Sequence, residues 1–563
     1  MSFFQESPQL GNQYEQDRVL KSFLRRSLPA EVRSEIEPQL TRMGELAAGP
    51  LLELAVVHRR DEPEHIPFDP WGRRIDEVRV NAAWREYARV AAEEGLIATA
   101  YERAHGAYSR IHQFALVYLF DPSAQFYTCP LAMTDGCART LEVLATPELR
   151  ERVLPRLLSR DPARVWTSGQ WMTERIGGSD VGLSEMLARE TPEGWRLRGT
   201  KWFVSAVTSE VALTLARPEG NGPGGKGLAL FFVQARDERG RLHRIVLDRL
   251  KDKLGTRQLP TAELTLDDTP AELVCGTSDG VRNMATMLNL TRTWNAVCCV
   301  AKLRRGLALA RDYARRRVAF GAPLAEKPLH IATLADLAAE QEAAFLLTFN
   351  AVALLGREET GELNPRDAAL LQLLQPVAKL TTARQAVAGA SEIVEGFGGA
   401  GYVEDTGLPE LLRDCQVYPI WEGTTNVLAL EAFRAIQRAD ALTPFLEEIR
   451  TRANAGSHLA LREPARAACS AAQRAQDWWS SSDRGPVAFE AGARRFALTL
   501  GRALSLALLV DQAQWAIDTD GDGRSAEAAR RFAAGGVDCL DAPDADPAAG
   551  AALALDTAQP LSG

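Results

Sequence analysis

A block of strand-like sequence interrupts a chain that otherwise follows the period of helices. Between Trp166 and Cys275 the apolar period shortens, and Gly, Pro and Asp turns separate the stretches that we expect to form strands, residues 194–205, 211–216, 228–234 and 261–266. On either side of this block, apolar residues recur at three- and four-residue spacing. The sequence therefore predicts an α+β chain in which a β module is inserted between helical regions.

The helical regions change character along the chain, which suggests domain boundaries. Three long helical stretches, at 284–320, 331–355 and 368–394, should pack as a bundle. They are followed by an Ala- and Arg-rich helical block and by a tail of Ala, Asp and Pro that we expect to be disordered. We predict an N-terminal helical domain (1–165), a β domain (166–276), a helical bundle (277–438), a helical extension (439–540) and a disordered tail (541–563).

The composition limits the classes of partner. Hydrophobic residues make up 46% of the 563 residues, as in an ordinary globular protein, and the formal net charge of -9 argues against a general attraction to polyanions. The eight cysteines form no CxxC pair and no cluster with histidines, so we expect neither structural zinc nor a disulfide framework. No apolar stretch reaches the ~20 residues of a membrane span, and the N-terminus lacks a signal-peptide pattern. We predict a cytoplasmic protein.

One carboxylate, Glu422, lies in an unusual setting. It is in the segment YPIWEGTTN (418–426), between an aromatic stretch and a polar turn that precedes an apolar helix. A carboxylate shielded from water becomes a stronger base, and abstraction of a carbon-bound proton needs such a base close to its target. The alternative, on this segment alone, is an acid favoured by the dipole at a helix N-terminus.

A second segment, QWMTERIGGSDV (170–181), has the composition of a ligand-binding turn. Its Gly-Gly-Ser turn can present backbone N–H groups to an anionic or carbonyl ligand, and Thr173 and Ser179 add hydroxyl groups. For this segment alone the alternative is a structural glycine turn between strands, which is the commoner role of such a turn.

Several segments together resemble the acyl-CoA dehydrogenase flavoprotein family. MTERIGGSDV resembles the family's flavin and substrate loop, GTKWFVSA its second flavin-contacting strand, ARRRVAFGAPL its bundle motif, and EGFGGAGYVEDTGLPELLRDCQVYPIWEGTTNVLALEAFR its catalytic C-terminal signature. CPLAMTDG, DRLKDKLGTR and the helical extension resemble the AidB-like (alkylation-response, isovaleryl-CoA dehydrogenase-like) branch. The resemblance implies an N-terminal helical domain, a central β barrel, a C-terminal four-helix bundle, bound FAD and a homotetramer.

The resemblance also implies which residues bind FAD. The first loop would lie along the isoalloxazine ring at Met172, Thr173, Gly178 and Ser179, and the neighbouring strand would flank it at Phe203, Val204 and Ser205. Residues that relatives send to the flavin site of an adjacent subunit, or that lie against the pyrophosphate, correspond to Arg317, Phe320, Gly398 and Gly399. For Arg317 alone, a solvated helix face is the alternative. If the match holds, each cofactor pocket is completed by a second subunit.

Glu422 matches the general base of the family, and the remaining cofactor contacts near it would be Trp421, Gly423, Thr424 and Asn426. The implied reaction is the α,β-dehydrogenation of an acyl-CoA thioester. Flavin and backbone N–H groups polarise the thioester carbonyl, Glu422 removes the α proton, and the β hydride passes to flavin N5. Electron-transferring flavoprotein is the expected electron acceptor. Nothing in the sequence specifies the length of the acyl chain.

Two alternatives from other classes remain open. The AidB-like branch is associated with DNA, so the chain could be a DNA-associated flavoprotein of the alkylation stress response with minor dehydrogenase activity. Residues 436–540 hold thirteen Arg and thirteen acidic residues, so only a one-sided stripe could bind DNA, with Arg462, Arg466, Arg474, Arg494 and Arg495 as candidates. The chain could also be a flavoprotein that sequesters an acyl ligand without turnover.

A segment at 518–523, DTDGDG, begins like an EF-hand calcium loop. Ala526 and Ala529 occupy the ninth and twelfth positions, where such a loop needs oxygen ligands. We therefore interpret the segment as a polar turn between helices and expect no metal site.

Overall fold

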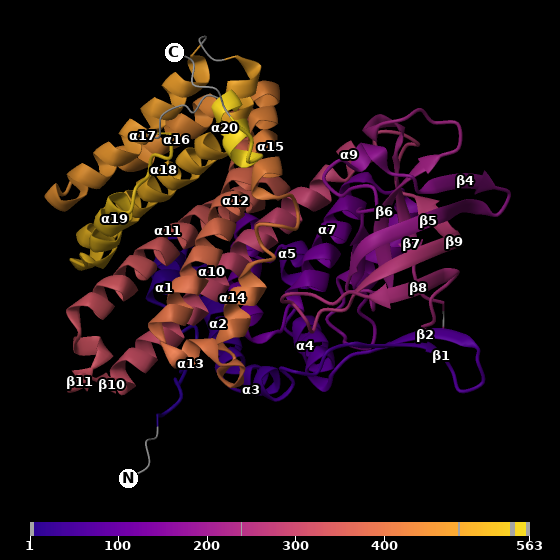
Figure 1. Ribbon diagram of the computed structural model, residues 1–563, viewed down its shortest axis with the longest axis horizontal. Helices are drawn as coiled ribbons and strands as arrows, with labels where there is room; N and C mark the ends of the chain where they lie inside the picture. The colour runs from indigo at the N-terminus through magenta and orange to yellow at the C-terminus, as the bar shows by residue number, and fades with distance from the viewer. Residues whose placement is uncertain (1–4, 238, 482–484, 541–546, 559–563) are drawn as a thin grey trace. The chain divides into compact units, whose positions relative to one another are not determined.

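The computed structural model describes residues 5–237, 239–481, 485–540 and 547–558. The chain folds as two units, whose helices and strands are labelled in Figure 1. The barrel unit comprises residues 10–305 and 398–417, and the bundle unit comprises residues 1–9, 306–397 and 418–563. Helix α10 (Ala285–Arg316) begins in the barrel unit and ends in the bundle unit.

The barrel unit begins with helices, as predicted. They are α1 (Arg18–Ser27), α2 (Ala30–Ala48), α3 (Pro50–Val57), α4 (Ala82–Glu93), α5 (Ala98–Glu102), α6 (Ser109–Phe120), α7 (Thr128–Leu144) and α8 (Pro147–Leu157), with single 3-10 turns η1 (Gly106–Tyr108) and η2 (Asp121–Ser123). Capping side chains explain where some of them start: Asp17 accepts from Leu20 N at 2.9 Å, and Asn81 from Trp84 N at 2.8 Å. These helices form the N-terminal helical domain that the sequence predicts.

A hairpin interrupts these helices and differs from the prediction of a wholly helical region. Strands β1 (Glu64–Phe68) and β2 (Arg74–Arg79) pair antiparallel. Asp69 Oδ1 accepts hydrogen bonds from Trp71 N and Arg73 N, both at 2.9 Å, which closes the turn between them. The turn sequence DPWGR is the signal that periodicity alone overlooks, because Asp, Pro and Gly each favour a tight turn.

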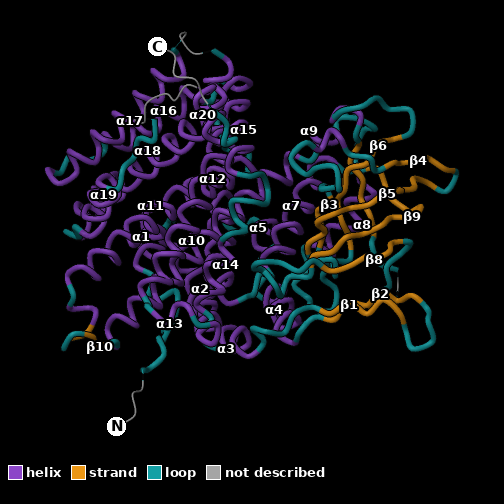
Figure 2. The backbone as a smooth tube through the Cα atoms, in the orientation of Figure 1, coloured by secondary structure: helices purple, strands orange, loops and turns teal. Residues whose placement is uncertain are grey.

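A closed β barrel follows (Figure 2, orange). Its strands are β3 (Ser168–Trp171), β4 (Leu187–Thr191), β5 (Gly194–Ser205), β6 (Val211–Pro218), β7 (Ala229–Gln234), β8 (Ile245–Leu250) and β9 (Thr261–Leu273), with turns η3 (Val181–Leu183) and η4 (Gly225–Gly227). The pairing runs β6–β4–β5–β9–β7 and returns from β7 to β6, while β3 pairs with β6 and β8 with β9. This ring encloses an apolar core that includes Leu197, Val204, Phe231 and Leu264.

The barrel unit closes with α9 (Gly280–Asn283), the start of α10, α13 (Gly399–Tyr402), η6 (Glu404–Thr406) and α14 (Leu408–Cys415). A buried polar network joins α6, α7 and α10. Arg110 Nη1 and Trp294 Nε1 each donate to Asp135 Oδ2 at 2.8 Å. Removing one member would leave a buried charge or donor unpaired, so this network fixes the helices against one another.

The bundle unit contains the long helices that the sequence predicts. They are the end of α10, α11 (Pro328–Glu359), α12 (Pro365–Gly396) and α15 (Thr425–Ala439), with the short hairpin β10 (Val318–Ala319) and β11 (Ala322–Pro323) and the turn η5 (Leu324–Glu326). α11 packs on α12, and α12 packs on α15. The predicted first helix, 284–320, ends at Arg316 instead, because Val318–Ala319 turns into the hairpin.

The helical extension is a layer of further helices on this unit, namely α16 (Leu442–Asn454), η7 (Leu459–Leu461), α17 (Arg462–Ser480), α18 (Pro486–Asp520) and α19 (Arg524–Ala534). Polar contacts fix the extension to α11: Ser525 Oγ donates to Glu342 Oε1 at 2.6 Å, and Arg502 Nη2 to Glu340 Oε1 at 2.9 Å. Of the segment at 518–523, the first three residues end α18 and residues 521–523 form the turn to α19, which confirms a turn between helices.

Among the described residues, α18 is the one helix long and apolar enough to cross a membrane, and 89% of its most apolar stretch is buried within the protein. In the tail, predicted to be disordered, Pro547–Ala554 forms helix α20. The alanines of this segment favour a helix. Residues 541–546 and 559–563 of the tail lie outside the described residues.

Helix α18 meets α12 through a glycine, which gives a prediction about stability. A Cβ atom at Gly501 would lie 2.0 Å from Thr381 Oγ1 and 3.0 Å from Thr381 Cβ. Alanine gains about 1 kcal/mol of helix propensity over glycine, but overpacking costs about 1–3 kcal/mol. We expect Gly501→Ala to lower the thermal midpoint, and Thr381→Ala to restore it in the double variant. Gly396→Ala, where the nearest atom is 3.9 Å away, is the matched control and should not lower the midpoint.

Candidate active site

The predicted cofactor loop after β3 is fixed to β5 by a buried ion pair. The Thr173 carbonyl oxygen accepts from Trp202 N at 2.9 Å. Lys201 Nζ donates to Glu174 Oε1 at 2.7 Å, and neither side chain is more than 5% exposed. Glu174 Oε2 also accepts from Glu185 N at 2.7 Å. Burial lowers the pKa of Lys201, an effect that the charge of Glu174 opposes. The pair therefore holds both ends of the loop in place.

The loop and β5 together present an exposed face. Phe203 is 54% exposed, whereas Val204 beside it is fully buried in the barrel core, as the alternation of side chains along a strand requires. Val204 can therefore offer a ligand only main-chain groups. Ser205 Oγ lies 3.4 Å from Thr261 Oγ1. Met172 and Thr173 are half-buried, and Gly178 and Ser179 are exposed.

Three cations at this face were not predicted, among them Arg249, whose guanidinium lies 5.9 Å from the centroid of the Trp202 ring. Lys251 Nζ lies 3.5 Å from the centroid of the Trp202 ring and 4.6 Å from that of Phe203, and it pairs with Glu263 at 2.6 Å. The Arg175 guanidinium lies 5.0 Å from the Trp202 centroid. Lys251 directly follows β8, far along the chain from Trp202 on β5. In the sequence, only the motif DRLKDKLGTR, in which Lys251 lies, could have indicated it.

That motif is packed closely against α14. Asp414 Oδ1 accepts from Thr256 N at 2.7 Å, and a Cβ atom at Gly255 would lie 2.6 Å from the Arg413 carbonyl carbon and oxygen. Lys253 Nζ donates to the carbonyl oxygens of Thr256 and Leu259, both at 2.6 Å, and burial lowers its pKa to about 8. Only glycine fits at position 255, so the loop and the helix hold one another in register.

Glu410 on α14 gives a prediction that depends on pH. Burial, and the nearby charge of Asp414, raise the pKa of Glu410 from 4.5 to about 7. Such a carboxylate stabilises the fold below its unfolded pKa, and that contribution is lost as the pH rises through its folded pKa. The wild type should therefore lose stability between about pH 4.5 and pH 8, whereas Gln does not titrate and the variant should not. We expect the unfolding free energy of Glu410→Gln minus that of the wild type to rise by about 1–3 kcal/mol over this range.

Thermal denaturation at the two pH values measures this difference. Glu404→Gln is the control, because Arg413 lowers the pKa of Glu404 and the relative stability of that variant should not rise with pH. A pH-independent difference for Glu410→Gln would contradict the prediction.

In the bundle unit, Glu422 lies in a strained turn before α15. Its φ is +55°, and that of Gly423 is +98°. A non-glycine residue in this region costs about 1–3 kcal/mol and persists only where its surroundings enforce it. Lys379 Nζ, from α12, donates to the carbonyl oxygens of Trp421 and Gly423, both at 2.7 Å. Hydrogen bonds from a charged donor contribute about 1.5–3 kcal/mol each, so the two suffice to hold the turn.

The other predicted residues of this turn have distinct places. Thr424 is the N-cap of α15, and its hydroxyl accepts from Val427 N at 3.4 Å. Capping is therefore the role of Thr424 and not of Glu422, which is half-buried. Trp421 packs near Tyr418, with ring centroids 6.2 Å apart, and Asn426 is exposed, accepting from Arg494 Nη1 at 3.4 Å.

Of the residues assigned to a neighbouring subunit's flavin site or to the pyrophosphate, Phe320, Gly398 and Gly399 are exposed, and Arg317 is half-buried. In the bundle unit, Phe320 is 98% exposed at the tip of the β10–β11 hairpin, and Arg317 Nη1 donates to Gln5 Oε1 at 3.4 Å. In the barrel unit, Gly398 and Gly399 are exposed at the start of α13, and no atom lies within 4 Å of a Cβ built at either. An aromatic ring left in water is unfavourable, so these surfaces are suited to contact another molecule.

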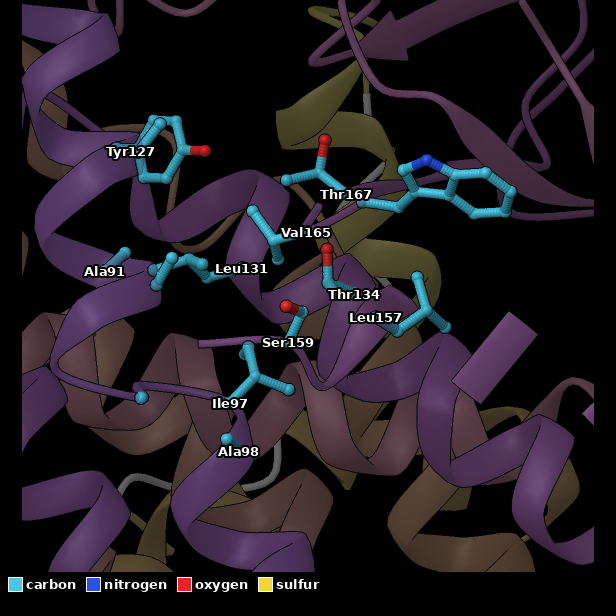
Figure 3. Close-up of a pocket in the computed structure, with 14 residues that line it drawn as sticks. Ala91, Ile97, Ala98, Tyr127, Leu131, Thr134, Leu157, Ser159, Val165 and Thr167 are labelled. Carbon is cyan, nitrogen blue, oxygen red and sulfur yellow. The ribbon is translucent and has the colours of Figure 1, made fainter. Parts of the chain in front are cut away.

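A cavity in the barrel unit does not coincide with the predicted site. It lies among helices α4, α7 and α8 and the segment before β3, and Figure 3 shows Tyr127, Leu131 and Val165 around it. Its volume of about 20 Å³ has room for one water molecule and not for an acyl chain. None of the predicted site residues lines it.

Two of the arginines proposed for DNA are neutralised by ion pairs. Arg466 pairs with Glu463 at 2.5 Å, and Arg474 pairs with Asp538. Arg494 donates to Asn426. The predicted stripe is therefore not a continuous row of uncompensated positive charge.

Comparison with known families matches nearly the whole chain in four segments. Residues 6–162 match the adaptive response protein AidB N-terminal domain, 169–269 the acyl-CoA dehydrogenase middle domain, 278–437 the acyl-CoA dehydrogenase C-terminal domain, and 440–538 the acyl-CoA dehydrogenase 11 C-terminal domain-like family. The segments follow the order predicted from the sequence.

Comparisons with single proteins agree with these family matches. The chain is 41% identical to acyl-CoA dehydrogenase family member 11 of Caenorhabditis elegans, over 91% of this chain and 86% of that protein. It is 30% identical to the putative acyl-CoA dehydrogenase AidB of Escherichia coli, over 72% and 74% of the two chains. The crystal structure of Caenorhabditis elegans ACDH-11 in complex with C11-CoA superposes with a TM-score of 0.92 at 38% identity, covering 98% of this chain and 97% of that one.

Proposed function

Because this chain belongs to the acyl-CoA dehydrogenase family of enzymes, we propose that it removes two hydrogens from the α and β carbons of an acyl-CoA thioester, with Glu422 as the base. The observation that carries the proposal is the conformation of Glu422. It is a carboxylate at positive φ, held by a buried lysine, at a helix start whose cap is supplied by another residue. Strain of this kind is typical of functional sites.

The residues present fit FAD as the cofactor. The half-exposed Phe203 ring and the open turn at Gly178 and Ser179 offer a flat apolar surface beside main-chain donors. The free space around Gly398 and Gly399 leaves room for a ligand to approach the backbone. Met172, Thr173 and Ser205 are the proposed ring contacts of the barrel unit, and Trp421, Gly423, Thr424 and Asn426 are the proposed cofactor contacts of the bundle unit. When bound, FAD would supply the two-electron acceptor for the β hydride.

The chain's own residues would prepare the thioester for proton loss. Main-chain N–H groups would polarise its carbonyl oxygen, which acidifies the α carbon. A Glu422 carboxylate oxygen would then accept the α proton, and the half-buried position of this side chain limits competing water. Each turnover would leave a trans-2-enoyl thioester and one proton on Glu422, which must leave before the next turnover.

Further proposals concern partners and location. We propose a homotetramer in which Arg317 and Phe320 complete the cofactor site of a neighbouring subunit, since Phe320 is almost fully exposed in the single chain. Electron-transferring flavoprotein is the proposed electron acceptor, and the cytoplasm the proposed location. The boundaries 1–165, 166–276, 277–438, 439–540 and 541–563 stay the proposed domain division, and the matched segments support the first four.

Anaerobic mixing of the purified protein with acyl-CoAs of graded chain length tests the function. Since the ACDH-11 complex holds C11-CoA, the series should centre on chains of about eleven carbons. We expect bleaching of the flavin absorbance and formation of the enoyl product with at least one chain length. Tight binding of acyl-CoA without bleaching would favour sequestration. Absence of bleaching together with salt-sensitive binding of duplex DNA would favour the DNA-associated alternative.

A further inference from the structure

The amino group of Lys379 spans the peptide segment that carries Glu422. Lys379 lies in the middle of α12, its side chain is fully buried, and its Nζ donates to the carbonyl oxygens of Trp421 and Gly423 at 2.7 Å each. These are the carbonyls of the residues immediately before and after Glu422. One buried cation therefore fixes both sides of a single residue.

The two hydrogen bonds determine where the Glu422 side chain points. With φ at +55° for Glu422 and +98° for Gly423, the chain reverses direction over two residues, and its carbonyl groups turn inward toward α12. A Cβ atom at Gly423 would also come within 3.1 Å of Leu428 Cδ2, so the turn cannot shift easily toward α15. Without the lysine, two partly buried carbonyl oxygens would lose this donor, and the left-handed conformation of Glu422 would lose support.

We propose that Lys379 is a positioning residue for the base, which holds the Glu422 carboxylate at the reach and angle needed to take the α proton. The inference rests on the proposed role of Glu422. It concerns the geometry of the base, because both of these hydrogen bonds reach the main chain of the turn. Misplacing a reacting group by about 1 Å can slow a reaction about a hundredfold while leaving binding unchanged.

The test separates proton abstraction from oxidation. A 3-thia-acyl-CoA has an acidic α carbon but carries sulfur in place of the β carbon, so it can exchange its α proton but cannot lose a β hydride. Exchange of that proton with solvent deuterium is followed by mass spectrometry on the FAD-loaded protein. FAD content and the Kd of the same ligand are measured alongside.

For Lys379→Met we expect exchange about a hundredfold slower, with FAD content and Kd within about threefold of the wild type. Lys379→Arg keeps a cation with N–H donors. Its exchange should therefore be at least about tenfold faster than that of Lys379→Met. Thr382→Val is the matched control. It removes a buried hydroxyl that donates to the main-chain carbonyl oxygens of Ala378 and Lys379 within α12 but leaves the Lys379 amino group in place, and it should exchange at the wild-type rate.

The proposal is overturned if Lys379→Met exchanges within about threefold of the wild type, or if its loss follows loss of FAD or of ligand affinity. Should Lys379→Met not retain FAD, Lys379→Gln is measured in its place, and failure of both to retain it would make the role structural and overturn the inference. Glu422→Gln separates the two hypotheses. Wild-type exchange in that variant would refute the base assignment itself, whereas lost exchange there with normal exchange in Lys379→Met would refute only the role of Lys379.

Discussion

Glu422→Gln should reduce flavin bleaching by acyl-CoA by about 10²–10⁴-fold, the usual contribution of a general base. Gln has nearly the shape of Glu but does not accept a proton from carbon at neutral pH, so the thioester would bind and not react. The reason is local. The carboxylate is half-buried in a turn whose main chain is held by Lys379 and whose helix cap is Thr424, so we expect the isosteric substitution to keep the fold. Stopped-flow absorbance under anaerobic conditions measures the rate, and titration with the same acyl-CoA measures the affinity.

Glu431→Gln is the matched control for this variant. Glu431 lies on α15, the helix that follows Glu422, and pairs with Arg434 at 3.3 Å on a partly exposed face. Its substitution changes the net charge equally and should leave bleaching unchanged. Bleaching of Glu422→Gln at more than about a tenth of the wild-type rate would be inconsistent with a general base at this position.

The regular elements of this protein were predictable where their sequence pattern is long. The strand β5 coincides with the predicted residues 194–205, and α11 and α12 contain the predicted helices at 331–355 and 368–394. β3, β4 and β8 were not predicted. They are four to six residues long, which is too short for a local apolar period to distinguish them from loops.

The predicted site residues lie in local sequence motifs, whereas the residues that hold these motifs in place lie elsewhere in the chain. Glu422 and the Gly-Gly-Ser loop could be found because each lies in one continuous segment. The lysines that fix these segments lie 42 to 44 residues away for Lys379 and 27 residues away for Lys201. A single lysine in a helix or strand has no pattern of its own, and the partner it meets is decided by packing. Burial and hydrogen bonding therefore identify it only once the fold is known.

The largest effect on stability is expected for Lys201→Met. This change leaves the Glu174 carboxylate buried without its cation, which typically costs about 3–5 kcal/mol. Glu174 also accepts from the backbone at Glu185 and Met186, so a protonated or displaced Glu174 would loosen the cofactor loop at both ends. We expect a lower thermal midpoint and loss of bound FAD on gel filtration, measured by the ratio of flavin to protein absorbance.

The double variant Lys201→Met with Glu174→Gln distinguishes the unpaired charge from a simple loss of packing. Gln removes the buried charge, yet its amide oxygen can still accept from Glu185 N, so most of the lost stability should return. If the midpoint of the double variant is as low as that of Lys201→Met, the buried charge is not the cause. If Lys201→Met alone changes neither the midpoint nor the FAD content, the ion pair does not hold the loop. The double variant should remain less stable than the wild type, because the Leu215 carbonyl oxygen, which accepts from Lys201 Nζ at 3.0 Å, would have lost its donor in both.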